Sequence, residues 1–270
     1  MAVFKCNFYS TALIRNVDVT VFLPETDAIV TYLNNMNVVD AHPRKEYKTI
    51  YLLHGMMDDH NSWINHTNVI NYAQKAKVAV VMPSAENSWY CDTGINGHKY
   101  FDFINYEIPA WAESVFPLKK GRENRFIAGL SMGGYGAAKG IFSAPEQYSK
   151  CGIFSGVTDI VAMSESSKKE HEENPNAPTD MVRYIFGKGI NSGDDEDLFY
   201  LSEKLAKSDN PKPDFFVGCG TDDSLYEPLC KFRAHLKNLG YNVSELDMPG
   251  YHEWMVWDKL VEAYINWLDL

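Results

Sequence analysis

The sequence predicts an α/β fold with a mostly parallel central sheet and helices on both of its faces. Short apolar runs recur along the chain, and several stop at a glycine or proline, as is typical of strands buried on both faces. Stretches with helical character separate these runs, which indicates βαβ crossovers between parallel strands. A chain of 270 residues commonly forms one such unit, so we expect a single domain over residues 1–270.

The elements can be placed in chain order. Residues 11–24 mix apolar and polar side chains, end at Pro24 and predict an opening pair of antiparallel strands, and the polar stretch 25–47 predicts a loop. Five buried strands are expected next, at 49–53, 78–82, 125–129, 151–154 and 215–218, and a last strand is expected at 243–248. Helices are expected at 110–115, after a proline that suits a first turn, and at 134–143, 226–239 and 254–268.

Residues 163–210 interrupt this alternation. They contain the charged run 168–173, two prolines and the acidic run 194–197. One interpretation is a solvated excursion on the surface. The other is a lid, because insertions in folds of this kind often cover the pocket. The sequence leaves both interpretations open.

Composition excludes several classes of partner. The net charge is −11 and the pI is about 5.2, which argues against nucleic acid and against anionic lipid surfaces. No apolar stretch reaches 18 residues and no secretion signal opens the chain, so we expect neither a membrane span nor export. The expected partner is a small molecule, and a homo-oligomer remains open.

The cysteines and glycines point to chemistry without a cofactor. Five cysteines without a C-x-x-C spacing argue against disulfides and thiolate zinc sites, and favour a reducing, cytoplasmic compartment. The histidine at 252 is not part of an H-E-x-x-H pattern, so we expect no metal. The glycines at 129, 133, 134 and 136 do not form G-x-G-x-x-G, and no P-loop lysine follows.

The strongest local signal is Gly129-Leu130-Ser131-Met132-Gly133, a G-x-S-x-G between an apolar strand and a helix. This is the context of a nucleophile elbow, in which a sharp turn holds the serine with its hydroxyl projecting outward. Small residues on either side let the neighbouring backbone pass closely. The pattern predicts that Ser131 is a nucleophile.

A serine hydroxyl needs a base, and the base needs an orienting acid. On this fold the expected order along the chain is serine, acid, histidine. His252 follows the last strand, and Asp222 and Asp223 follow the strand before it. Spacing alone does not separate the two aspartates, and Asp222 could instead cap the helix that begins near Tyr226.

The tetrahedral intermediate of acyl transfer needs two backbone N–H donors. One is expected at Met132, the residue after the nucleophile, and the other at Met56, in the loop after an early strand. Aromatic residues are frequent in the same loops and could line a substrate pocket or belong to the core. The pocket candidates are Trp63, Trp89 and Trp254.

At these motifs the chain resembles the bacterial tributyrin esterases of the esterase D group, which also contains S-formylglutathione hydrolases and carbohydrate acetyl and feruloyl esterases. The resemblance covers almost the whole chain. The segments that carry it, in family order, are Leu52-Leu53-His54-Gly55-Met56, His60-Asn61-Ser62-Trp63, Asn87-Ser88-Trp89-Tyr90, 126–136 around the serine, 219–227 around the aspartates and His252-Glu253-Trp254.

The resemblance implies an α/β-hydrolase fold and a serine carboxylesterase that acts on short-chain acyl esters, including acetylated or feruloylated sugars. The family pattern Gly-x-x-Asp selects Asp223 over Asp222, and it supports Met56 and Met132 as oxyanion donors. Two rival interpretations stay open. One is acyl transfer or hydrolysis of a thioester such as S-formylglutathione by the same triad, and the other is a binding module without catalysis.

Overall fold

The structure of the chain is a computed structural model. It describes residues 1–25, 32–34, 45–92, 97–174, 185–186 and 189–270. Most of the loop predicted at 25–47 lies outside these residues, as do 175–184 within the possible lid.

Eight strands form one sheet in the order β1-β2-β4-β3-β5-β6-β7-β8. The first two are paired antiparallel, β2 is antiparallel to β4, and all other pairs are parallel. The mostly parallel sheet is therefore confirmed. The strands are β1 (Ala2–Ser10), β2 (Arg15–Leu23), β3 (Thr49–Leu53), β4 (Ala79–Pro83), β5 (Arg125–Leu130), β6 (Lys150–Phe154), β7 (Asp214–Gly220) and β8 (Val243–Met248).

The bounds of the opening strand pair were wrong. The structure places one strand before residue 11, at Ala2–Ser10, and only the second strand inside the predicted range 11–24. The first strand lies at the edge of the sheet, where most of its side chains are partly or fully exposed. Such a strand lacks the continuous apolar run by which buried strands are recognised in a sequence.

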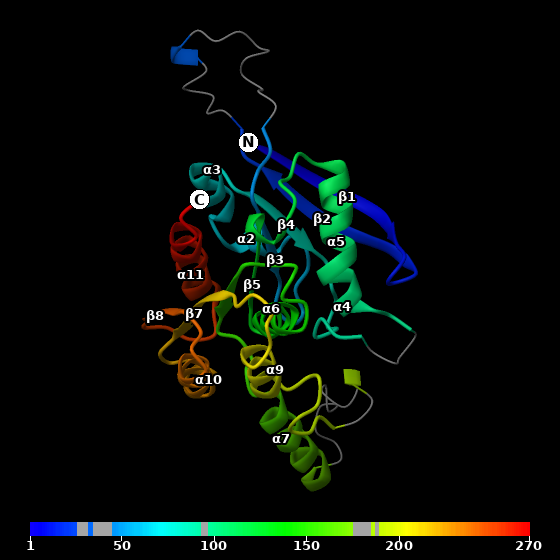
Figure 1. The fold of residues 1–270 in the computed structure, drawn as a ribbon, viewed down its shortest axis with the longest axis vertical. Coiled ribbons are helices and arrows are strands. Elements are labelled where there is room, and N and C mark those ends of the chain that lie inside the picture. The colour runs from blue at the N-terminus through cyan, green and yellow to red at the C-terminus, as the bar shows by residue number, and fades with distance from the viewer. Residues whose placement is uncertain (26–31, 35–44, 93–96, 175–184, 187–188) are drawn as a thin grey trace.

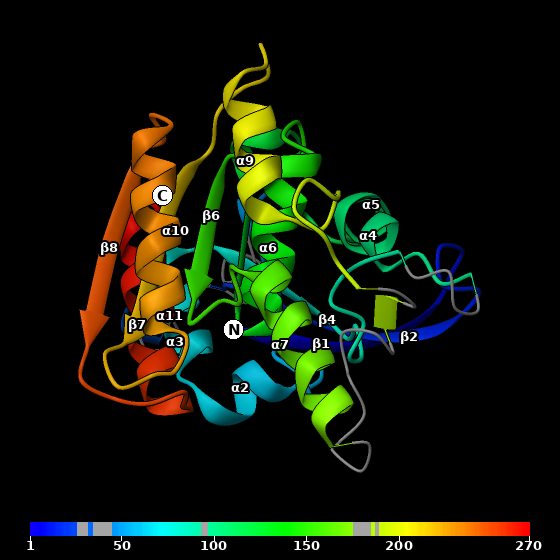
Figure 2. The same ribbon diagram turned by 90° about the horizontal axis from the view of Figure 1, so that it is seen from below.

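Helices cover both faces of the sheet (Figures 1 and 2). One face carries α5 (Ile108–Val115), α6 (Met132–Ser143), α9 (Leu198–Ala206) and α10 (Tyr226–Asn238), whose apolar residues share one core cluster. The other face carries α2 (Ser62–His66), α3 (Val69–Ala76) and α11 (Trp254–Trp267), which share the second. The described residues also form α4 (Tyr100–Asp102), a π-helical turn at Phe103–Glu107, a 3-10 turn at Arg122–Asn124 and α7 (Ile160–Glu173).

Part of the segment 163–210 belongs to a core layer. Helix α9 packs against α6 and α10, and its residues Leu198, Leu201 and Leu205 are buried. Helix α7 extends away from the sheet at one end of the molecule (Figure 2). A lid role for 163–210 stays a prediction.

This topology gathers the loops that were expected to carry chemistry. The strands β3, β5, β6, β7 and β8 run parallel, so their carboxyl ends meet at one edge of the sheet. The loops that leave this edge contain, in turn, Met56, Ser131, Ser155, Asp223 and His252.

Candidate active site

Ser131 sits on a strained turn between β5 and α6. Its φ is 52° and its ψ is −119°, a backbone conformation that residues other than glycine rarely adopt. The turn is tight enough to require glycine on both sides. A β-carbon on Gly129 would lie 2.4 Å from the backbone of Gly133, and one on Gly133 would lie 2.6 Å from the carbonyl oxygens of Leu53 and His54. The strain projects the hydroxyl away from the turn, as a nucleophile elbow requires.

The structure brings the three predicted residues together. The Ser131 hydroxyl lies 3.0 Å from His252 Nε2, and His252 Nδ1 lies 2.8 Å from Asp223 Oδ2. The Asp223 side chain is 0% exposed, whereas that of His252 is 36% exposed. A buried carboxylate on Nδ1 fixes the tautomer in which Nε2 is free to accept the serine proton.

The two adjacent aspartates have different partners. Asp223 Oδ1 accepts a hydrogen bond of 2.9 Å from the Leu225 N–H, while Asp222 Oδ2 accepts one of 3.1 Å from the Gly250 N–H. Asp222 therefore ties its loop to the loop that carries His252. The alternative that Asp222 caps α10 is wrong, because the residue before that helix is Leu225 and it makes no side-chain cap.

The carboxylate of Asp223 is held in its charged form. Burial alone would raise its pKa, but hydrogen bonds from His252, from the Leu225 N–H and from the Ser155 hydroxyl lower the pKa below its ordinary value of 3.8. Asp223 is therefore ionised at neutral pH and can stabilise a charged imidazole.

Two supporting residues were not found by sequence reasoning. Ser155 follows β6, has φ 43°, is fully buried and lies beside Asp223 and the Cys219 thiol. Trp257, on α11, places its ring 4.9 Å from the His252 ring at 86°. The only signal for Ser155 was its position at the carboxyl end of a buried strand. A tryptophan on the inner face of a helix carries no such signal.

The loop after β3 approaches the nucleophile from the other side. His54 Nδ1 donates to the Gly55 carbonyl at 2.6 Å, and its Nε2 accepts from the Ala85 N–H at 2.9 Å. The Tyr90 hydroxyl donates to the His54 carbonyl at 2.8 Å. These bonds hold Met56, half-buried, on this loop, while Met132 begins α6. The roles of Met56 and Met132 as oxyanion donors remain predictions.

The three tryptophans proposed for a pocket have different environments. Trp63 is 0% exposed and donates from Nε1 to the Leu53 carbonyl at 3.0 Å, and Trp89 is 1% exposed. Both lie in the core clusters, the alternative that the sequence left open. Trp254 is only partly buried, and its ring stacks on His66 at 4.8 Å. Of the three, Trp254 is the one placed at the surface near His252.

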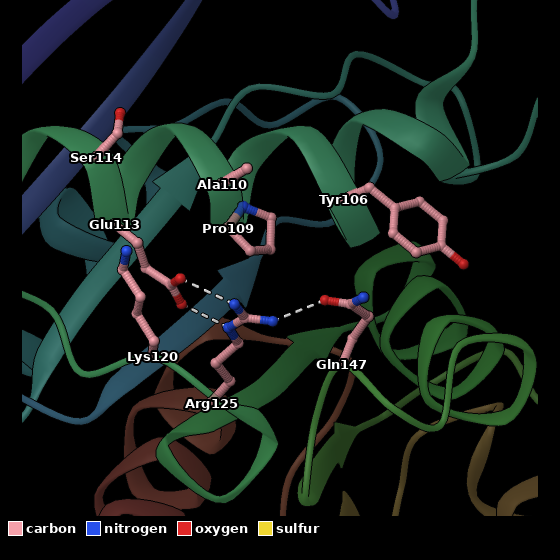
Figure 3. Close-up of a pocket in the computed structure, with 8 residues that line it drawn as sticks. All are labelled: Tyr106, Pro109, Ala110, Glu113, Ser114, Lys120, Arg125 and Gln147. Atoms are coloured by element: carbon pink, nitrogen blue, oxygen red, sulfur yellow. Dashed lines mark hydrogen bonds and ion pairs between the residues drawn. The ribbon is translucent and has the colours of Figure 1, made fainter.

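A polar cavity of about 400 Å³ lies at the opposite end of β5 (Figure 3). Arg125, the first residue of β5, pairs there with Glu113 and donates to the Gln147 side chain at 2.8 Å. Because Ser131 follows the last residue of the same strand, this cavity is separate from the triad.

Within the residues that the structure describes, no three His, Cys, Asp or Glu side chains are grouped so that they could hold a metal ion. Among the helices formed by those residues, none has both the length and the apolar character needed to cross a membrane.

The sheet, the strained serine and the Ser–His–Asp contacts define a serine hydrolase of the α/β-hydrolase type. The model of the family Esterase, described as "Putative esterase", matches residues 10–265, and the chain belongs to this family. The protein is accordingly a serine esterase that hydrolyses carboxylic esters.

Similar proteins extend over the full chain. An acetyl esterase of Caldicellulosiruptor saccharolyticus is 30% identical and covers 99% of this chain and 98% of its own. The fluorophosphonate-binding serine hydrolase F of Staphylococcus aureus, solved with substrate bound, is 28% identical with a TM-score of 0.82, covering 100% of this chain and 98% of its own. The S-formylglutathione hydrolase of the same organism is 28% identical with a TM-score of 0.80, and the match covers 100% of this chain and 99% of that hydrolase.

Proposed function

We propose that this esterase removes short acyl groups, acetyl groups above all, from alcohols, with the acetyl esters of plant carbohydrates as its natural class. The observation that carries this proposal is the connected triad, with contacts of 3.0 and 2.8 Å. The end-to-end similarity to an acetyl esterase supports the choice of acyl group. Feruloyl esters of the same carbohydrates are the second acyl class to test.

The geometry suits a two-step reaction. His252 takes the proton from Ser131 as the hydroxyl attacks the ester carbonyl, and the Met56 and Met132 amides hold the oxyanion. His252 then protonates the leaving alcohol. In the second step His252 takes a proton from water as the water attacks the acyl-enzyme, and it returns a proton to Ser131 as the acyl group leaves as the acid. Asp223 keeps the imidazole in the productive tautomer and stabilises its charged form.

The test compares Ser131→Ala with the wild type on p-nitrophenyl acetate. We expect a loss of about 10⁵–10⁶-fold in kcat, because the covalent intermediate cannot form. The matched control is Ser143→Ala, which removes an exposed hydroxyl at the other end of the same helix and should keep wild-type activity. Near wild-type turnover by Ser131→Ala would refute the assignment.

A panel of esters then defines the acyl group. We expect kcat/KM to be highest for acetyl and to fall as the acyl chain lengthens, with acetyl-xylan and methyl ferulate as the carbohydrate and aromatic members. A preference for long acyl chains, or no release of acetate from xylan, would contradict the proposed substrate class.

A second candidate is hydrolysis of S-formylglutathione, favoured by the 28% identity to a hydrolase of that thioester. The same triad would serve, because a thioester forms the same acyl-enzyme. Direct comparison of kcat/KM for S-formylglutathione and for acetyl esters decides between the two.

The five free cysteines support a reducing compartment, and we propose the cytoplasm.

A further inference from the structure

The carboxylate of Asp58 lies beside the nucleophile. A β-carbon on Gly55 would lie 2.5 Å from Leu130 Cδ1, 3.3 Å from Asp58 Oδ2 and 3.7 Å from Ser131 Cβ, so the carboxylate and the serine both lie close to Gly55, beside the Leu130 side chain. The carboxylate is thus within roughly 7 Å of the nucleophilic side chain, a distance at which charges still interact appreciably in a partly solvated site. Asp58 follows the proposed oxyanion donor Met56 by two residues.

Among the described residues, no hydrogen bond or ion pair accounts for this charge. In the described part of the chain, the Asp58 side chain has no hydrogen-bond donor and no ion-pair partner, although it is half-buried. Its neighbour Asp59 shows the contrast, because Asp59 Oδ1 accepts a hydrogen bond of 2.6 Å from the Asn61 N–H. A part-exposed carboxylate with no cationic partner acts on any charged group that enters the same space.

The loops around the triad reinforce the same sign of charge. The segments that carry or flank the site contain no lysine or arginine, and they are 54–68, 84–92, 129–138, 154–167, 219–230 and 248–258. Asp58 is therefore not balanced by a cation from these loops. Charge of one sign in a cleft raises the local concentration of oppositely charged substrate and opposes substrate of the same charge.

We propose that Asp58 is a specificity-determining residue that selects esters by charge, favouring cationic over anionic substrates at the triad. The proposal rests on the proposed esterase function and narrows it. It also bears on the second candidate, because the glutathione part of S-formylglutathione carries two carboxylates and one ammonium group. Asp58 disfavours that net negative substrate relative to a neutral sugar acetate.

The experiment uses three aryl acetates of similar shape: 3-acetoxy-N,N,N-trimethylanilinium, phenyl acetate and 3-acetoxybenzoate. Each kcat/KM is divided by the rate of uncatalysed hydrolysis of that ester, which removes differences in leaving-group reactivity. We expect the ratio of cationic to anionic ester to exceed one in the wild type and to fall about five-fold in Asp58→Asn, from one unit charge at this distance.

The control variant is Asp209→Asn, which removes an equal charge at an exposed position outside the site loops and should leave the ratio unchanged. Asp58→Ser serves as the second variant if the asparagine substitution lowers the melting temperature. An unchanged ratio in a folded Asp58 variant, or an equal fall in Asp209→Asn, would overturn the proposal.

Failure of the proposed function is recognised separately, by absence of phenyl acetate hydrolysis in the wild type. In that case the readout becomes the rate at which Ser131 is phosphonylated by a neutral fluorophosphonate and by one with a trimethylammonium group. A preference for the cationic reagent that is lost in Asp58→Asn supports the proposal, and equal preferences in both proteins overturn it.

Discussion

Asp222 and Asp223 are adjacent in the sequence, yet only Asp223 hydrogen-bonds to His252. Asp223 is fully buried against His252 Nδ1, while Asp222 bonds to the Gly250 N–H near the surface. From the residues alone the two were equivalent, and the family resemblance selected Asp223. The physical basis of the difference is the turn after β7, which sends consecutive side chains to opposite sides.

This difference predicts unequal effects of the same substitution. Asp223→Asn should lower kcat by about 10⁴-fold, because an amide can donate to Nδ1 and so stabilise the unproductive tautomer. Asp222→Asn should lower kcat by about ten-fold or less, since it weakens only a loop contact of 3.1 Å. Steady-state kinetics on p-nitrophenyl acetate measures both, and losses of equal size would contradict the assigned roles.

His54 predicts a dependence of stability on pH. Burial lowers the pKa of His54 below its ordinary value of 6.5, although the bond to the Gly55 carbonyl and the charges of Asp58 and Asp59 act in the opposite direction. Below pH 6.5 the unfolded chain therefore binds a proton that the folded protein does not. Stability should decrease as the pH falls below that value.

The slope from this one group is at most about 1.4 kcal/mol per pH unit. Thermal unfolding between pH 5 and 8, compared for the wild type and His54→Asn, isolates the contribution of His54 to the pH dependence of stability. The variant should be less stable at pH 8, because it loses the bonds that join Gly55 to Ala85, and its stability should vary less with pH. Identical pH profiles would contradict a buried neutral His54.

At the scale of elements, β3 to β7 were predictable because each is a short apolar run, whereas the half-buried β8 alternates apolar and polar residues. Helices α2 and α3 were not, because they are only five and eight residues long and bury few apolar residues. The segment that contains α9 was interpreted either as a solvated excursion or as a lid, on account of its charged runs. Its inner face is nevertheless buried against α6 and α10.

One buried ion pair joins two elements next to the site. Arg233 on α10 bonds through two nitrogens to Asp247 on β8, at 3.0 and 2.9 Å, and its side chain is only 4% exposed. Arg233→Ala should lower the free energy of unfolding by about 3 kcal/mol, because it leaves Asp247 without its partner. Chemical denaturation monitored by fluorescence gives the value.

The control for this prediction is Lys237→Ala on the same helix. Lys237 pairs with Glu245 at 2.7 Å, but the two side chains are 49% and 37% exposed, so the loss should be below about 1 kcal/mol. Equal effects of the two substitutions would show that burial does not govern the strength of these pairs.

At the scale of the whole molecule, the net charge of −11 predicts how salt alters catalysis. As NaCl rises from about 20 to 500 mM, kcat/KM for a cationic ester should fall and that for an anionic ester should rise, while phenyl acetate serves as the reference. Part of this salt dependence should persist in Asp58→Asn, because the remaining carboxylates are unchanged. Parallel changes for all three esters would argue against a long-range electrostatic effect.

The candidate catalytic residues could be predicted from the sequence. The G-x-S-x-G, its position between strand and helix, and the order of serine, acid and histidine depend on short windows and on chain order. The environments of Trp63 and Trp89 did not follow from such windows, and neither did the support given by Ser155 and Trp257.

The sequence by itself determined the mostly parallel α/β architecture and the positions of the candidate nucleophile and its candidate histidine, because local periodicity and motif spacing are properties of neighbouring residues. Only the tertiary structure decided which side chains surround them. The contact between Ser131 and His252 joins residues 121 positions apart. Such contacts depend on the order and direction of the strands, which set the loops of β3, β5, β6, β7 and β8 side by side at one edge.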